Sequence, residues 1–298
     1  MKVLLTGASG VMGRSTIQAL HGAGHTVVGL ARSSKAAAAV AARGAEPVMG
    51  DLFDTERVAR AMRGCDAVVN FATSVPIGLT MLVPGAWRTN DRIRSHGAAI
   101  VAAAAREAGV GRLVQQSLSF VYADCGDDWI DEHSTIDLTR ASEPVVVAEG
   151  EVDDFTRAGG VGVSLRFGQI AGPDGTTAWL LRRAKAGRPI GIGARDSWAH
   201  VVHADDVGTA AVAALAAPAG AYNVGAEPVK RGDMADMFAV VGGRKEGRLF
   251  SRPMMWLGGQ RLEMISRSQR VSSQRFCDRT GWHPQYPKLT PDWFDGVA

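Results

Sequence analysis

Residues 4–15 read LLTGASGVMGRS and place three glycines, Gly7, Gly10 and Gly13, directly after a short apolar run. A segment of helical composition follows at once. Glycine permits positive backbone φ and close approach of a ligand, at a cost in conformational entropy. Free N–H groups and the dipole at the start of a helix suit a phosphate. The stretch therefore predicts a strand, a pyrophosphate-binding turn and a helix, which is how a dinucleotide-binding domain begins.

Apolar runs of strand length recur along the chain and alternate with helical segments. The longest runs are nearly continuous in Val, Leu and Ile, as is typical of parallel strands covered by helices on both faces. The sequence thus predicts an α/β fold with a doubly wound parallel sheet. The expected strands are residues 3–5, 26–30, 47–49, 67–71, 113–116, 162–167 and 221–224. The expected helices are residues 11–23, 33–43, 55–62, 89–108, 144–158 and 177–186.

The pattern changes after Phe167, where Gly- and Pro-rich turns become frequent. We expect a dinucleotide-binding domain over residues 1–170, to which residues 200–225 also contribute. A smaller substrate-binding lobe is expected from residues 171–199 and 226–298.

Composition narrows the class of protein. Hydrophobic residues make up 46% and charged residues 21% of 298 residues, with a net charge of +3, which is typical of a folded, soluble chain without a nucleic-acid partner. Cys65, Cys125 and Cys277 lie far apart, so neither a disulfide framework nor a metal site is indicated. Neither a secretory signal nor an apolar run of about 18 residues is present. We expect a cytoplasmic protein with a small-molecule substrate and no membrane partner.

The end of the second strand indicates which dinucleotide is bound. An acidic residue there would bind a ribose hydroxyl, and a basic residue would accept a 2′-phosphate. The sequence has no carboxylate at this point and offers Arg32, Ser33 and Lys35. These residues favour NADP over NAD. The alternative is that Arg32 and Lys35 are surface residues that open a helix.

A series of motifs extends over nearly the whole chain. They are the glycine turn, Gly50-Asp51-Leu52, Asn70-Phe71-Ala72, Asn90, residues 117–122, Leu165-Arg166-Phe167-Gly168 with Gly172-Pro173, residues 203–207, and Gly281-Trp282-His283-Pro284. Together they resemble the extended short-chain dehydrogenase/reductase family, which includes NAD-dependent epimerases and dehydratases. Through its long helices the resemblance also implies a homodimer.

The resemblance implies a set of cofactor-binding residues. In the turn they are Gly7, Ser9, Gly10, Val11, Met12 and Gly13. Asp51 and Leu52 would flank the adenine, and Ala72 and Thr73 would line the path of the cofactor. Asn90 would shape the site from its helix, and Phe167 and Gly168 would lie near the nicotinamide. The alternatives are a helix or turn cap for Asp51 and a structural role for Asn90.

The expected active site departs from the family pattern, which uses a Ser or Thr hydroxyl and a Tyr-x-x-x-Lys pair. Alignment puts Leu118 at the hydroxyl position, between Ser117 and Ser119. Residues 140–149 contain no tyrosine and no lysine, and Ala141 and Val145 take the two positions. Tyr122 follows the fifth strand, at the edge of the sheet where ligands bind. We expect Tyr122 to be the substitute acid, with Ser117 and Ser119 as further catalytic candidates.

The apolar and aromatic side chains of the loops predict a hydrophobic small substrate. A nucleotide diphosphate is disfavoured, because Trp198 and His200 fill the position where nucleotide-sugar members of the family carry an arginine. The acidic residues 124–133, with Trp129, form either a wall of the site or a solvated loop. His203 either contacts substrate or positions the last crossover helix, with Asp205 or Asp206 as its N-cap. The apolar and aromatic residues considered for the site are Trp87, Trp129, Trp179, Trp198, Met254, Met255 and Trp256.

The sequence therefore predicts NADP(H)-dependent redox chemistry on a small, largely apolar carbonyl or alcohol. Two other functions stay open. One is a cofactor-binding sensor or interaction protein without chemistry, and the other is a non-redox isomerase or lyase that uses residues 124–133.

Overall fold

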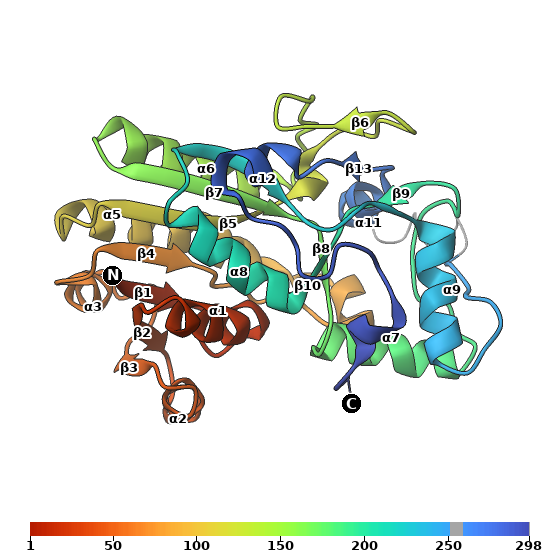
Figure 1. Ribbon diagram of the computed structural model, residues 1–298, viewed down its shortest axis with the longest axis horizontal. Helices are drawn as coiled ribbons and strands as arrows, with labels where there is room; N and C mark the ends of the chain where they lie inside the picture. The colour runs from red at the N-terminus through yellow and green to blue at the C-terminus, as the bar shows by residue number, and fades with distance from the viewer. Residues whose placement is uncertain (251–258, 298) are drawn as a thin grey trace.

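The computed structural model describes residues 1–250 and 259–297. Its centre is a seven-stranded parallel sheet with the order β11-β7-β5-β4-β1-β2-β3 (Figure 1). The strands are β1 (Lys2–Thr6), β2 (Thr26–Ala31), β3 (Glu46–Met49), β4 (Ala67–Asn70), β5 (Arg112–Leu118), β7 (Val161–Phe167) and β11 (Gly220–Val224). The seven expected strands and the doubly wound fold are confirmed. The strand order reverses between β1 and β4, where open α/β sheets bind ligands.

Helices cover both faces of this sheet. One face packs against α1 (Val11–Gly22), α8 (Ala204–Ala214) and α12 (Gln274–Thr280), and the other against α3 (Thr55–Met62), α5 (Ala98–Glu107) and α6 (Glu143–Arg157). Consecutive residues of β1 alternate between the two cores: Val3 and Leu5 belong to the first, and Leu4 belongs to the second. Because both faces are buried, the strand needs apolar residues at every position. Helix α2 (Ser34–Ala41) lies beside the β2–β3 edge.

The long helix expected over residues 89–108 is interrupted. It consists of α4 (Arg88–Arg92), a π-helical turn over Ile93–Gly97 and α5. Such turns occur often at functional sites because the wider turn changes which side chains share a face. A Cβ on Gly97 would lie 2.7 Å from Leu52 Cδ2, so the turn packs closely against the β3–α3 loop.

Smaller elements lie beyond the carboxyl end of the sheet (Figure 1). Three two-stranded sheets pair β8 (Gln169–Ala171) with β10 (Val201–His203), β9 (Trp198–Ala199) with β12 (Val229–Lys230), and β6 (Trp129–Ile130) with β13 (Arg270–Val271). The helices of this region are α7 (Gly175–Lys185), α9 (Arg231–Val241), α11 (Gly259–Ser266) and the 3₁₀ turns η1 (Gly78–Leu82), η3 (Ser119–Val121) and η4 (Pro291–Phe294). The division into two lobes stays a prediction.

The start of α8 corrects two expectations. His203, and not Asp205 or Asp206, is the N-cap, and its Nδ1 accepts from the Asp205 N–H at 3.3 Å. Its ring stacks on Tyr286 at a centroid distance of 3.7 Å, so His203 packs against the C-terminal segment and does not line the substrate cavity. Asp206 instead accepts from the backbone N–H groups of Gln285 and Tyr286.

No helix among the described residues is long and apolar enough to cross a membrane. The same residues hold no group of three His, Cys, Asp or Glu side chains arranged for a metal ion.

Candidate functional site

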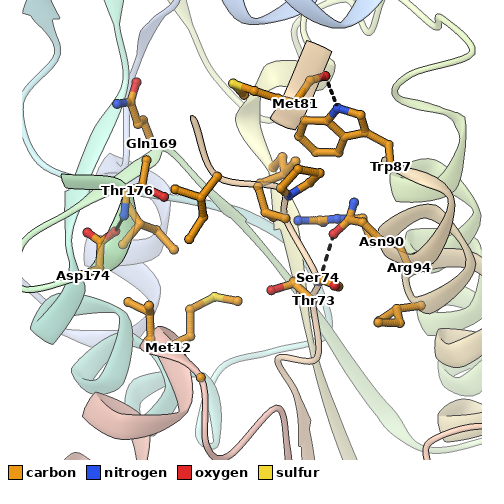
Figure 2. A pocket seen from close by; sticks show the side chains of 18 of the residues that line it. Met12, Thr73, Ser74, Met81, Trp87, Asn90, Arg94, Gln169, Asp174 and Thr176 are labelled. Atoms are coloured by element: carbon orange, nitrogen blue, oxygen red, sulfur yellow. Dashed lines mark hydrogen bonds between the residues drawn. The ribbon is translucent and has the colours of Figure 1, made fainter. Parts of the chain in front are cut away.

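A cavity of about 690 Å³ opens at the carboxyl edge of the sheet. The glycine turn forms one end, and residues of α7 and α11 line the other. Figure 2 shows the two walls facing one another, with Trp87, Asn90 and Arg94 on one side and Gln169, Asp174 and Thr176 on the other. The site therefore combines the predicted phosphate-binding turn with side chains from both halves of the chain.

The glycine turn fits a pyrophosphate. Gly7 has φ +67°, and a Cβ there would lie 2.4 Å from the Phe71 carbonyl oxygen. A Cβ on Gly13 would lie 2.3 Å from the Gly7 carbonyl oxygen, so only glycine lets α1 pack against the turn. Within the described part of the chain no side chain caps α1, and its first turn holds no acidic residue. The N–H groups of Val11 and Met12 therefore face the cavity without an intrahelical partner.

Most of the predicted cofactor residues are brought together here. Those that line the cavity are Gly7, Ser9, Gly10, Val11, Met12, Arg32, Asp51, Leu52, Ala72, Thr73, Asn90, Phe167 and Gly168. Three others do not line it: Gly13 supports the turn from behind, Ser33 caps α2 by accepting from the Ala36 N–H, and Lys35 is exposed. Of the three residues predicted to bind the 2′-phosphate, Arg32, Ser33 and Lys35, only Arg32 lines the cavity.

Asp51 and Asn90 have local partners as well as cavity positions. Asp51 Oδ1 accepts from the Phe53 N–H at 2.9 Å, whereas Asp54 is the N-cap of α3. Asn90 Oδ1 accepts from the Ser74 N–H at 3.2 Å and holds the loop after β4 against α4 (Figure 2). Both residues shape the cavity wall through the backbone that they fix.

Three apolar side chains that the sequence alignment matches to the reactive groups of the family pattern lie in the cavity wall. Leu118, Ala141 and Val145 all line this cavity, although they come from β5, the loop before α6, and α6 itself. Their convergence agrees with the alignment made from sequence. Leu118, Ala141 and Val145 themselves carry no hydroxyl, phenol or ammonium group.

Tyr122, Ser117 and Ser119 do not reach the cavity, which corrects their predicted catalytic roles. Tyr122 is completely buried, and its hydroxyl donates to Asn223 Oδ1 and accepts from Arg166 Nη1, both at 2.8 Å. Burial raises the pKa of Tyr122 to about 12. The 3₁₀ turn after β5 directs this side chain toward β11 and away from the cavity, so it serves the core.

The two serines have structural partners of their own. Ser117 Oγ donates to Glu149 Oε1 at 2.5 Å, and Ser119 Oγ lies 3.0 Å from His200 Nδ1. Glu149 also receives two hydrogen bonds from Arg166, at 2.8 Å from Nε and 2.7 Å from Nη2. Burial lowers the pKa of Arg166, but the bonds and charge of Glu149 raise it, and the net shift is upward. This buried pair joins α6 to β7, and sequence reasoning missed it.

The acidic residues 124–133 are not part of the cavity wall. Asp124 accepts from the Ser268 N–H, and Asp127 pairs with Lys230 Nζ at 2.6 Å. Of the two alternatives for this segment, the wall of the site is therefore wrong, because these carboxylates hold the β6–β13 region together. Trp129 is 56% exposed beneath the Arg270 guanidinium, and Trp198 donates to Asp127, so neither lines the cavity as a substrate residue.

The other apolar and aromatic residues considered for the site divide into two groups. Trp87 and Trp179 line the cavity, where Trp87 Nε1 donates to the Met81 carbonyl oxygen at 2.9 Å (Figure 2). Met254, Met255 and Trp256 lie outside the described residues.

Two buried arginines in the cavity wall were missed from the sequence. Arg94 is 5% exposed and Arg231 is 3% exposed, and burial lowers the pKa of each to about 10. Arg94 lies in the π-helical turn that follows Asn90, so helical periodicity gives no signal for its position in the cavity wall. Arg231 donates to the carbonyl oxygens of Ile265 and Arg267, contacts that depend on the packing of the C-terminal segment.

The fold and the glycine cradle define a dinucleotide-binding α/β protein with a substrate cavity at the carboxyl edge of its sheet. The chain belongs to the NAD dependent epimerase/dehydratase family, whose model matches residues 3–225. The expected family is thereby confirmed, and the chain is an enzyme of the oxidoreductase and epimerase type.

Individual relatives agree with this assignment. A Streptomyces protein called 3-diazoavenalumate denitrifying reductase is 30% identical over 315 residues, covering 100% of this chain and 99% of the relative. A 2-alkyl-3-oxoalkanoate reductase of Shewanella oneidensis is 28% identical, covering 70% of this chain and 56% of its own length. The NAD complex of UDP-glucose 4-epimerase from Thermus thermophilus superimposes with a TM-score of 0.78 at 21% identity, covering 98% and 96% of the two chains, and confirms the fold.

Proposed function

We propose that the protein is an NADP(H)-dependent reductase of a small, largely apolar substrate whose electrophilic atom needs no proton from the enzyme when it accepts hydride. The observation that carries this proposal is the cavity wall: Leu118, Ala141 and Val145, which the alignment puts at the positions of the proton-transferring groups, line the same cavity as the glycine cradle.

The cradle and the β2 end supply the cofactor site. The N–H groups of Val11 and Met12 would bind the pyrophosphate, and Arg32 would bind a 2′-phosphate, since no carboxylate follows β2. Phe167 and Gly168 would lie near the nicotinamide of NADPH held there, which would supply the hydride. The protein's own contribution is then orientation and exclusion of water by apolar walls.

The apolar side chains of Leu118, Ala141 and Val145 constrain the substrate. A ketone that accepts hydride becomes an alkoxide and needs a proton or another source of positive charge. An aryl diazonium group is already cationic, and its net reduction, R–N₂⁺ + NADPH → R–H + N₂ + NADP⁺, requires no added proton. The full-length relative named for denitrifying a diazo compound supports this class of substrate. The apolar and aromatic lining, including Trp87 and Trp179, suits an aryl group.

A carbonyl substrate is the second candidate. The relative named for reduction of a 3-oxoalkanoate favours it. Water or another hydroxyl of the cavity wall, such as Thr73 or Ser74, would then supply the proton, and the rate would suffer from the loss of the family's positioned acid.

The test compares acceptors and a restored active site. Wild-type protein with NADPH is offered a hydroxybenzenediazonium salt and a panel of aryl and alkyl ketones, and both NADPH absorbance and released N₂ are measured. A triple variant, Leu118→Ser with Ala141→Tyr and Val145→Lys, receives the same panel. We expect wild type to reduce the diazonium salt and release N₂, and the triple variant to gain ketone reduction.

Two results would reject the proposal. If wild type reduces ketones as fast as the triple variant, the apolar positions do not limit the chemistry. If NADPH binds but no acceptor is reduced, a cofactor-binding sensor describes the protein better.

A further inference from the structure

The substrate half of the cavity carries unbalanced positive charge. Arg94, Arg231 and Arg261 line it; Arg261 is paired with Asp91, and Asp174 is the carboxylate on the opposite wall. Both oxygens of Asp174 have partners, because Oδ1 accepts from the Thr176 and Thr177 N–H groups at the start of α7 and Oδ2 accepts from the Thr177 hydroxyl. A wall otherwise rich in apolar side chains thus presents buried guanidinium groups without an equal number of available carboxylates.

Arg94 is the arginine whose surroundings point most directly to a ligand. It is only 5% exposed, yet it makes no ion pair with any described residue. Asp91 on α4 is the nearest carboxylate, and its charge raises the pKa of Arg94, but its Oδ2 binds Arg261 and its Oδ1 forms no hydrogen bond with Arg94 or any other described residue. Residues 251–258 contain no Asp or Glu that could serve instead. Burying a charge without a counter-ion is costly, so an anionic ligand is the partner that this site lacks.

The hydrogen bonds of Arg94 leave one edge of its guanidinium group available. Nη1 donates to Gln116 Oε1 at 3.1 Å, whereas the Nε–Nη2 edge donates to no described residue. This edge is the one that binds a carboxylate with two parallel hydrogen bonds. The π-helical turn over Ile93–Gly97 places Arg94 on the cavity side together with Asn90 (Figure 2).

Gln116 supplies a second donor beside Arg94. The side chain is 2% exposed and lines the cavity, and its Nε2 has no hydrogen-bond partner among the described residues. The Arg94 bond to Oε1 orients this side-chain amide, and the Gln116 backbone carbonyl oxygen accepts from Gln115 Nε2 at 2.8 Å. Gln115 is in turn held by Asn70 on β4 at 2.7 Å. An orphan buried donor next to an unpaired guanidinium is a preorganised arrangement for an anionic oxygen.

We infer that Arg94 and Gln116 bind a carboxylate of the substrate, which makes the substrate a small aryl or alkyl acid rather than a neutral molecule. This inference rests on the proposed function only for the identity of the cavity as the substrate site. Arg94 anchors the acid at the side of the cavity formed by α4 and β5. The apolar wall of Leu118, Ala141 and Val145 then faces the remainder of the molecule.

Calorimetric binding tests the inference without turnover. The probes are para-hydroxycinnamate and its neutral amide, each titrated with and without saturating NADP⁺, so that a failure of cofactor binding is recorded separately. The variants are Arg94→Met, Arg94→Lys and Gln116→Leu. The matched control is Arg112→Met, because Arg112 lies on β5 outside the cavity and donates to the Ala214 and Ala217 carbonyl oxygens.

We expect wild type and the Arg112→Met control to bind the acid about tenfold to a hundredfold more tightly than the amide, as for a hydrogen bond to a charged group. Arg94→Met should abolish this preference and leave amide and NADPH binding unchanged. Arg94→Lys should retain part of it, and Gln116→Leu should reduce it, which keeps the test valid if Arg94→Met does not fold.

The inference is wrong if wild type does not prefer the acid, or if the preference survives in both Arg94→Met and Gln116→Leu. It is also wrong if Arg94→Met weakens NADPH binding while the preference for the acid remains, since Arg94 would then belong to the cofactor site.

Discussion

Replacing Glu149 by Gln should destabilise the fold strongly while leaving the cavity intact. Both side chains of the Glu149–Arg166 pair are buried, with exposures of 10% and 6%. Glutamine can still accept from Ser117 and Arg166 Nε, but its NH₂ group replaces the oxygen that now accepts from Arg166 Nη2 at 2.7 Å. A donor then faces a donor, and the guanidinium keeps its charge without a counter-ion. Breaking a buried pair in this way costs about 3–5 kcal/mol.

That cost is a large share of a typical stability of about 5–15 kcal/mol, so urea unfolding should measure it readily. The companion variant Glu149→Leu with Arg166→Met removes both charges and should cost less than the sum of the two single changes. Neither residue lines the cavity, so NADPH affinity should be unchanged in variants that fold. A loss of less than about 1 kcal/mol for Glu149→Gln would refute the reasoning from burial and geometry.

Three further predictions follow from buried groups. Tyr122→Phe should lower the free energy of unfolding by about 1–3 kcal/mol without changing turnover, because Asn223 and Arg166 each lose a partner. A loss of activity at equal stability would restore Tyr122 as a catalytic candidate. Gly13→Ala should weaken NADPH binding at least about tenfold, since the added Cβ would lie 2.3 Å from the Gly7 carbonyl oxygen. Unchanged NADPH affinity in a fluorescence titration would contradict the role of the glycine turn in cofactor binding. Burial lowers the pKa of His200 from 6.5 to about 3, so the unfolded chain binds more protons between these values. Its contribution to stability is therefore present above pH 6.5 and is lost as the pH falls toward 3, with a slope of up to about 1.4 kcal/mol per pH unit. Urea unfolding at neutral and mildly acidic pH should show that His200→Gln loses less of its unfolding free energy on acidification than wild type does. Equal losses would exclude His200 as the cause.

The sheet and the cradle could be predicted because their causes are local. Val3, Leu4 and Leu5 are all apolar since both faces of β1 are covered. Gly13 is required by contacts with Gly7 and Ala8 of the same turn, and Gly7 by the chain after β4, which pairs with β1. Alignment with the family pattern likewise indicated that Leu118, Ala141 and Val145 would lie close together at the site.

The polar side chains were harder to place because their partners are distant in the chain. Tyr122 lies at the carboxyl edge of the sheet as expected, but Asn223, 101 residues away, draws its hydroxyl into the core. The π-helical turn that presents Arg94 follows from close packing of Gly97 on Leu52, which periodicity does not reveal. Positions on an element were therefore predictable, whereas side-chain direction depended on tertiary contacts.

The central claim is that the glycine cradle and Arg32 bind NADP(H), and a parallel calorimetric titration of wild-type protein with NADPH and NADH tests it most directly. We predict that NADPH binds about tenfold to a hundredfold more tightly than NADH, and that Arg32→Ala removes most of the difference. Equal or tighter binding of NADH would contradict the role of Arg32, and binding of neither would contradict the cofactor site itself.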